Sequence, residues 1–161
     1  MKNDPKYIID TLAAYKHANK ISTDWNDVYN NALNQFAQYK YTGKIYRAIR
    51  ISPVDFKQRF VDSNLSIYAQ IKQYLQSKKG TYRFTKNKQY AIHPSSKFIS
   101  IVIEQTSVGL DIDKLLVEQY PVYNNKPFYI THAYEQEILA PITNANILTI
   151  VQPQANSIPY R

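Results

Sequence analysis

Two glutamates stand two residues apart in the segment AYEQEILAPI, in a chain that has four glutamates in all. Side chains two apart on a strand share one face, which would put Glu135 and Glu137 about 6–7 Å from each other along it. Carboxylates that close repel each other, and such pairs are typical of acid–base sites. A solvated edge strand with protective charges would show the same pattern, so the pair alone leaves both interpretations open.

A second candidate for chemistry is an arginine set among apolar residues. In the string KIYRAIRI (residues 44–51), Arg47 falls on the side of a predicted strand that carries Ile45 and Ile49. Its planar guanidinium, with five N–H donors, fits a phosphate or a pyrophosphate. An internal ion pair with an acidic residue would explain Arg47 equally well. Arg50 falls on the opposite face, and we interpret it as an ordinary surface residue.

The elements that must position these residues begin with helices. Asp4-Pro5 is a helix start signal, and a second one at Ser22-Thr23-Asp24 precedes another amphipathic stripe. We therefore expect residues 1–40 to form a helical N-terminal part. Pro53 opens a further short helix, and residues 65–76 show the spacing of another amphipathic one.

The rest of the chain has mostly the pattern of β-strands. Strands are predicted over residues 45–51, 81–84, 97–105, 127–142 (in one or two pieces) and 147–151. We expect a turn at Ser107-Val108-Gly109, a helical turn over 111–116 and a loop over 121–126. Helices first and antiparallel strands later predict a single α+β domain over residues 1–161, with a β core over 41–152 and a tail over 153–161.

The composition limits the classes of function. Lysine and arginine exceed the acidic residues by 20 − 12 = 8, which indicates an acidic partner or a solubilising surface. The absence of cysteine excludes disulfides, thiolate catalysis and cysteine-based zinc sites, and the three histidines lack a local metal-ligand spacing, so we expect no metal. No apolar stretch approaches the roughly 20 residues of a membrane-spanning helix, and the N-terminus lacks the apolar run of a signal peptide. We therefore expect a cytoplasmic protein with no membrane partner.

The order of the motifs resembles that of ADP-ribosyltransferases of the arginine–serine–glutamate type. That family has an aromatic–arginine strand, a strand with an S-T-S or S-F-T motif, an apolar strand with a glycine turn, and an E-x-E strand. Here Tyr46-Arg47 matches the first motif, Phe84-Thr85 matches the latter part of the second, and the segment EQEIL (135–139) matches the last. The resemblance covers about residues 45–151 and rests on the order of motifs that are each short.

The resemblance implies a fold and an activity. N-terminal helices would pack on a split, mostly antiparallel β-sandwich with the NAD cleft between its sheets. The enzyme would transfer ADP-ribose from its substrate NAD to a protein and release nicotinamide, with no metal. Glu137 would stabilise the oxocarbenium-like transition state and hold a ribose hydroxyl. Glu135 would orient or deprotonate the incoming nucleophile.

The remaining motif residues would bind NAD. Tyr46-Arg47 would supply the cofactor-binding strand, with Arg47 on the pyrophosphate. Thr85 would support Glu137 by a hydrogen bond, and Phe84 or a nearby tyrosine would flank the cationic nicotinamide ring.

Arg83 departs from the family pattern, which usually has a serine two residues before Thr85. That serine ordinarily helps to hold the catalytic glutamate and the nicotinamide ribose. Four interpretations are open: Thr85 alone does the holding, Arg83 adds a second contact to a phosphate, the site is degenerate and the enzyme weak or inactive, or Arg83 faces away on the surface.

The resemblance also points to the acceptor. A glutamate in the first position of the E-x-E motif accompanies arginine acceptors, so Glu135 favours a protein arginine as the target. The aromatic segment before it lies where the family places its target-recognition loop, although each ring would serve equally in a core; its members are Tyr120, Tyr123, Phe128 and Tyr129.

Two rival functions are kept open. Fifteen tyrosines interleaved with lysine could form a basic nucleic-acid-binding surface, although no known nucleic-acid-binding fingerprint is present. An enzyme-derived module could bind a partner without turnover. As the main expectation we take a monomeric transferase that modifies a nucleic-acid-associated protein; a phage-encoded modifier acting in the host cytoplasm would fit these features.

Overall fold

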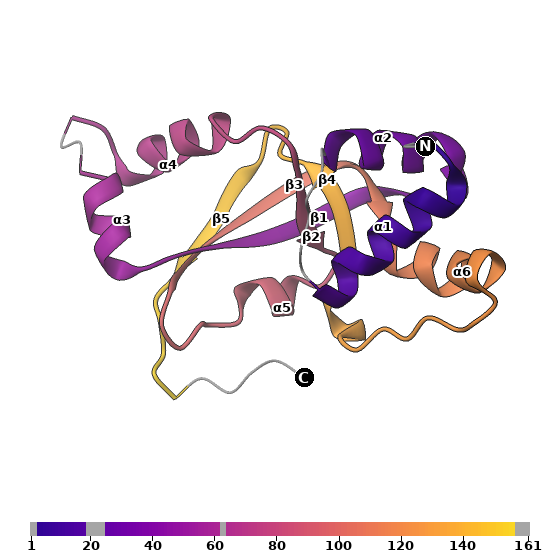
Figure 1. Cartoon of the computed structure of the whole chain (residues 1–161). Coiled ribbons are helices and arrows are strands. Elements are labelled where there is room, and N and C mark those ends of the chain that lie inside the picture. Colours follow the sequence, from indigo (N-terminus) through magenta and orange to yellow (C-terminus); the bar gives the residue numbers. More distant parts are fainter. Residues whose placement is uncertain (1–2, 19–24, 62–63, 157–161) are drawn as a thin grey trace.

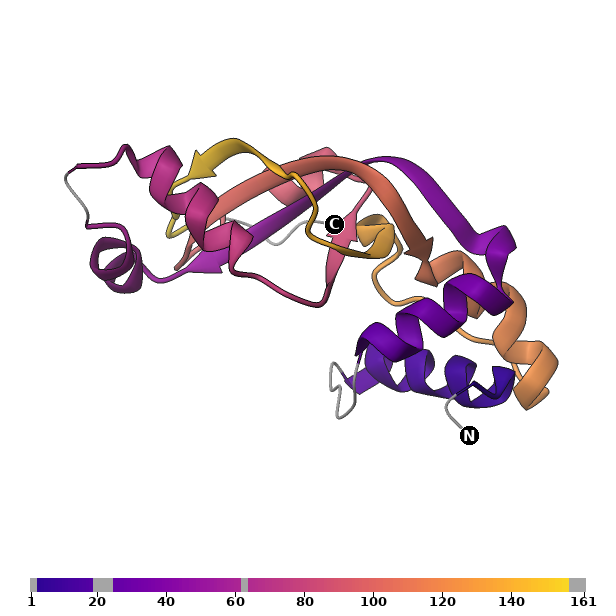
Figure 2. The same ribbon diagram turned by 90° about the horizontal axis from the view of Figure 1, so that it is seen from above.

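Helices lie at both ends of an antiparallel sheet in the computed structural model (Figure 1). The structure describes residues 3–18, 25–61 and 64–156. In chain order the elements are α1 (Pro5–Ala18), α2 (Trp25–Gln35), the 3-10 turn η1 (Ala37–Tyr39), β1 (Lys40–Ile51), α3 (Pro53–Arg59), α4 (Ile67–Gln76), β2 (Thr81–Thr85), α5 (Lys88–Ile92), β3 (Ile99–Asp111), α6 (Ile112–Asn124), the 3-10 turn η2 (Ala133–Glu135), β4 (Glu137–Pro141) and β5 (Asn146–Val151). Seen from above, α1, α2 and α6 gather at one end and α3 and α4 at the other (Figure 2).

The predicted helix starts are largely confirmed. Helix α1 begins at Pro5, and the Asp4 carboxylate accepts the backbone N–H of Lys6 at 2.9 Å. The second predicted start, at residues 22–24, lies outside the described residues, and α2 follows directly after it. Ser52 and Ser66 cap α3 and α4 by accepting a backbone N–H from the first turn of each helix.

The five strands form one antiparallel sheet in the order β1-β2-β4-β3-β5, with a further pairing between β1 and β3. This pairing closes β1, β2, β4 and β3 into a small barrel, and β5 adds to β3 outside it. The predicted α+β class with an antiparallel sheet is confirmed. The strands are joined in one sheet, whereas we expected the two separate sheets of a split sandwich, because long β3 pairs with β1, β4 and β5 along its length.

The predicted turn at Ser107-Val108-Gly109 is wrong. Strand β3 runs through it to Asp111 and pairs with all twelve residues of β1. Gly109 serves a close approach instead: a Cβ there would lie 2.4 Å from Ile138 Cγ2 and 2.8 Å from the Leu139 carbonyl oxygen. The glycine lets β4 cross tightly against the end of β3, which brings the E-x-E segment onto the sheet.

The predicted helical turn over 111–116 is longer than expected. Asp111 caps α6 as its side chain accepts the Lys114 N–H at 3.2 Å, and the helix continues through Pro121 to Asn124. Asn125 then ends it in the left-handed conformation, with φ 54°. The expected loop over 121–126 is therefore mostly the last turn of a helix.

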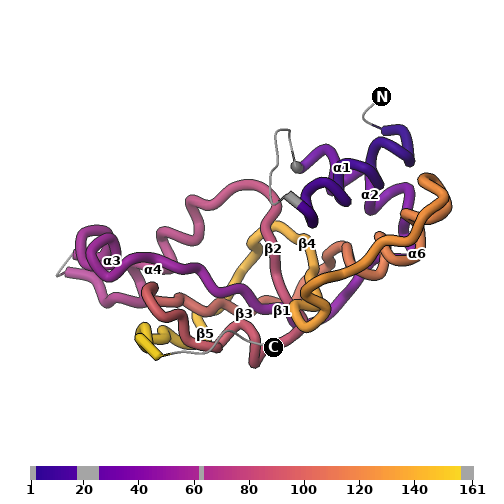
Figure 3. Tube along the Cα trace, turned by 60° about the horizontal axis from the view of Figure 1, so that its bottom comes forward, coloured from indigo at the N-terminus to yellow at the C-terminus, as the bar shows by residue number. Residues whose placement is uncertain are grey.

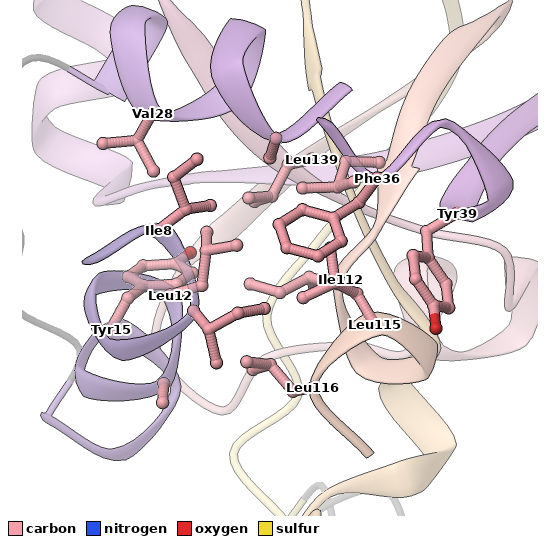
Figure 4. Close-up of a cluster of buried hydrophobic side chains, with 14 of the residues drawn as sticks. Ile8, Leu12, Tyr15, Val28, Phe36, Tyr39, Ile112, Leu115, Leu116 and Leu139 are labelled. Carbon is pink, nitrogen blue, oxygen red and sulfur yellow. The ribbon is translucent and has the colours of Figure 1, made fainter. Parts of the chain in front are cut away.

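Two apolar clusters form the core. The first lies where α1, α2 and α6 meet the sheet and includes Ile8, Leu12, Leu115 and Leu139, all at most 2% exposed (Figure 4). The second fills the space between the sheet and helices α3 and α4 and includes Phe84, Ile101 and Ile138. Strand β4 contributes Leu139 to the first cluster and Ile138 to the second. Glu137, the first residue of this strand, therefore lies near both clusters.

Candidate functional site

The sheet register brings the three sequence motifs together. Tyr46 of β1 pairs with Thr85 of β2, and Thr85 pairs with Glu137 of β4. The tube in Figure 3 shows β2 and β4 side by side next to β1. A cavity of about 340 Å³ opens over this junction. It is bordered by all seven predicted site residues: Tyr46, Arg47, Arg83, Phe84, Thr85, Glu135 and Glu137.

The two glutamates meet at this cavity by a different route from the one we expected. Glu135 is not on a strand: it ends the turn η2, and Gln136 follows in the left-handed conformation with φ 44°. Glu137 is the first residue of β4. The shared strand face was therefore the wrong reason for their proximity. The tight turn brings both carboxylates toward the same cations.

Glu137 is buried, at 2% exposed, and ion-paired on both oxygens. Its Oε1 accepts a hydrogen bond from Arg83 Nε and lies 3.5 Å from the hydroxyl of Tyr15. Its buried Oε2 lies 3.1 Å from Lys16 Nζ. Burial of a carboxylate without such partners would be costly, and the two cations offset that cost.

Arg83 points into the site. Besides its bond to Glu137, its NH2 lies 3.6 Å from Glu135 Oε2, and its guanidinium carbon lies 4.9 Å from the centre of the Tyr15 ring. The interpretation of Arg83 as a surface residue facing away is wrong. Burial alone would lower the pKa of Arg83, but Glu137 and its neighbours raise it above the ordinary value, so the guanidinium remains charged.

Thr85 supports the turn rather than the Glu137 carboxylate. Its hydroxyl donates to the Glu135 carbonyl oxygen and accepts the Asn87 N–H at 2.9 Å. No hydrogen bond between Thr85 and the Glu137 carboxylate is found among the described residues, which corrects the expected role. The Glu135 carboxylate itself accepts from the Tyr90 hydroxyl at 3.2 Å. Thr85 and Tyr90 thus fix the main chain and the side chain of Glu135 respectively.

Arg47 lies partly buried at the cavity wall and has no acidic partner among the described residues. Its NH1 donates to the Arg83 carbonyl oxygen at 2.7 Å, and its guanidinium lies 5.2 Å from the centre of the Tyr82 ring. Its Nε is buried and has no hydrogen-bond partner in the described structure. Burial lowers the pKa of Arg47 from its ordinary value. Of its two interpretations, the internal ion pair is not found among the described residues, and the external anion stays a prediction.

The predictions for Phe84, Arg50 and the aromatic segment are each modified by the structure. Phe84 borders the cavity but is 2% exposed, and its ring belongs to the second apolar cluster. Arg50 also borders the cavity, so its interpretation as an ordinary surface residue was incomplete. In the aromatic segment Phe128 is buried, whereas Tyr129 is 74% exposed. Tyr120 and Tyr123 are half-buried in α6 and pack against the first cluster.

Sequence reasoning missed four residues of the site: Tyr15, Lys16, Tyr90 and Asp113. Tyr15 carries the helical spacing of α1, which indicates a core residue, and its ring does belong to the first cluster. The signal that could have singled out Lys16 is its place beside that apolar stripe. Asp113 has the sequence position of an ordinary acidic residue in the first turn of a helix.

A pH titration tests the Tyr90–Glu135 contact. Burial, together with the Glu135 charge, raises the pKa of Tyr90 from 10.0 to about 12. In the unfolded chain the phenol ionises near 10, so the folded state loses stability as the pH rises from about 10 toward 12. We expect this loss to be smaller in Tyr90→Phe, measured by urea unfolding across that range. Tyr68→Phe, at an exposed tyrosine, should leave it unchanged; identical profiles for wild type and Tyr90→Phe would contradict the contact.

Comparisons with known proteins add no relative. The described residues contain no helix with the length and apolarity to cross a membrane, and no cluster of three or more His, Asp or Glu side chains that could hold a metal ion. The chain matches no protein-family model, and no curated protein or solved structure matches it either.

Proposed function

We propose that this protein is a mono-ADP-ribosyltransferase that transfers ADP-ribose from NAD to an arginine of a protein target. One observation carries the proposal: three motifs far apart in the chain border a single cavity, with a carboxylate pair and an arginine that has no acidic partner in the described structure. The cavity volume of about 340 Å³ falls within the usual range for small-molecule sites. In this proposal the α+β barrel is a variant of the family's fold.

Arg47 fits the pyrophosphate. Its Nε is a buried donor without a partner among the described residues, and a buried donor of this kind is satisfied by a charged acceptor. Arg50 borders the same cavity and adds positive charge. Tyr90, which borders the same cavity, offers a ring for the nicotinamide in place of the buried Phe84.

The two glutamates divide the chemistry. The bond between nicotinamide and C1 of its ribose breaks, the electron pair leaves with nicotinamide, and positive charge grows on the ribose, where Glu137 stabilises it. A guanidine nitrogen of the acceptor forms the new bond to C1 and gives its proton to Glu135. Because Glu135 is held by Tyr90 and Thr85, it faces the acceptor in a fixed position.

Binding and turnover can be tested separately. Purified protein is incubated with NAD labelled in the adenine part and with a small guanidine compound, and both free nicotinamide and labelled guanidine are measured. Release of nicotinamide with a labelled guanidine supports the proposal. NAD bound without release would favour an inactive module, and loss of binding with added nucleic acid, together with a steep salt dependence, would favour a nucleic-acid binder.

Arg47→Ala should weaken NAD binding. A charge-assisted bond of this kind contributes about 1.5–3 kcal/mol, so we expect the KM for NAD to rise roughly 10- to 100-fold. The matched control is Arg59→Ala on α3, because the Arg59 guanidinium packs over the Tyr74 ring and does not border the cavity. An unchanged KM in Arg47→Ala, with its fold intact, would remove the assigned role of Arg47.

A further inference from the structure

Lys16 of helix α1 lies between two carboxylates that come from other elements. Its Nζ is 2.9 Å from Asp113 Oδ1 of α6 and 3.1 Å from Glu137 Oε2 of β4, and the Lys16 side chain is 8% exposed. A third carboxylate oxygen, Glu135 Oε2, lies 4.0 Å away. The N-terminal helical part therefore places a cation beneath the proposed catalytic carboxylate.

Asp113 of α6 contacts both Glu137 and Lys16. Its Oδ2 accepts the backbone N–H of Glu137 at 3.1 Å, while its Oδ1 faces Lys16. Asp113 thus fixes the main chain of Glu137, and Lys16 fixes the side chain. The two are joined to each other, so the main chain and the carboxylate of Glu137 are oriented by one connected unit.

Lys16 keeps its charge in this buried position. Burial alone would lower its pKa, but the charges of Glu137 and Asp113 raise it above the ordinary value. A buried ammonium between two carboxylates has little freedom to move, because an ion pair holds it on each side. It is therefore a rigid support rather than a flexible surface contact.

The two cations at Glu137 differ in their position. Arg83 borders the cavity and its side chain is 36% exposed, so a ligand entering the cavity meets it. Lys16 does not border the cavity and contacts the other oxygen of Glu137. When a ligand displaces Arg83, Lys16 still holds the carboxylate in place.

We infer that Lys16, together with Asp113, is the positioning unit for Glu137. This inference rests on the proposed function of Glu137, and it makes α1 a part of the active site. Among the described residues, Lys16, Tyr15 and Arg83 contact the Glu137 carboxylate, while Asp113 accepts the Glu137 backbone N–H and Glu135 lies 4.0 Å from Lys16.

The test separates positioning from substrate binding. In Lys16→Met, which keeps the length of the side chain but removes its charge, we expect kcat for nicotinamide release to fall roughly 100-fold, the cost of a misplaced catalytic group. The KM for NAD should change less than about twofold, since Lys16 does not border the cavity. Lys16→Arg should recover part of kcat. Lys6→Met, the same change at an exposed lysine of the same helix, should leave both constants unchanged.

Crystal structures provide a readout that does not depend on activity. A shifted Glu137 carboxylate in Lys16→Met would support the inference even if the wild type releases no nicotinamide, a result that would remove the proposed function alone. An unmoved carboxylate, or a wild-type kcat in Lys16→Met, would overturn it. Should Lys16→Met fail to fold, Asp113→Asn tests the same unit: a lower kcat with an unchanged KM supports it, and an unchanged kcat overturns it.

Discussion

Replacing Glu137 by glutamine is expected to lower the release of nicotinamide from NAD roughly a thousandfold. Glutamine keeps the size and shape of the side chain but removes the negative charge, so the growing positive charge on the ribose loses its counter-charge. The carboxylate is 2% exposed, and a charge acts more strongly there than it would in water. The measurement is kcat for nicotinamide release under saturating NAD, with thermal unfolding as the check on the fold.

A matched control comes from the same sheet. Glu104 of β3 is partly exposed and lies 3.9 Å from Lys44, so Glu104→Gln removes the same charge away from the cavity. We expect this variant to keep its kcat. If Glu137→Gln keeps nicotinamide release within about twofold of the wild type while it remains folded, the proposed division of roles between the glutamates is wrong.

Much of the scaffold could be predicted from local patterns. Asp4-Pro5 and the alternation in residues 44–51 gave the start of α1 and the existence of β1, because capping and pleating are properties of neighbouring residues. The turn expected at Ser107-Val108-Gly109 failed for the opposite reason. Whether a glycine turns the chain or admits a neighbouring strand depends on contacts with Ile138 and Leu139, which no local pattern contains.

In the candidate site, too, some residues could be predicted from local motifs and others depend on contacts between distant elements. The motif order led to Arg47 and Glu137, and both border the cavity. Apart from the place of Lys16 beside the apolar stripe of α1, no local pattern marks Lys16 or Asp113, since their contacts come from a meeting of three elements that are distant in sequence. Glu135 borders the cavity beside Glu137 although it is not on the expected strand, because the left-handed Gln136 between them turns the chain so that both carboxylates approach the same cations.

Arg83→Ser is expected to raise kcat/KM for NAD about tenfold. In the wild type the Arg83 guanidinium lies on the Glu137 carboxylate and near Glu135. In the proposed function it would there compete with the cationic nicotinamide–ribose part of NAD. Its displacement costs part of a charge-assisted bond, and about 1.4 kcal/mol of that cost corresponds to a factor of ten. The smaller hydroxyl, which the resembling family has at this position, removes the competitor. Glu137 keeps Lys16 as a partner, so the variant does not leave a buried charge alone.

Stability should move in the opposite direction from activity. The Arg83 side chain is 36% exposed, so solvent weakens its ion pairs, and their loss is expected to cost about 1 kcal/mol and lower the Tm. Arg83→Lys separates charge from shape: it keeps the cation, so we expect its kcat/KM to stay near that of the wild type. A rise in KM for NAD in Arg83→Ser would instead assign Arg83 to the pyrophosphate beside Arg47. An unchanged kcat/KM with a lower Tm would make Arg83 a structural partner of the glutamates with no part in substrate access.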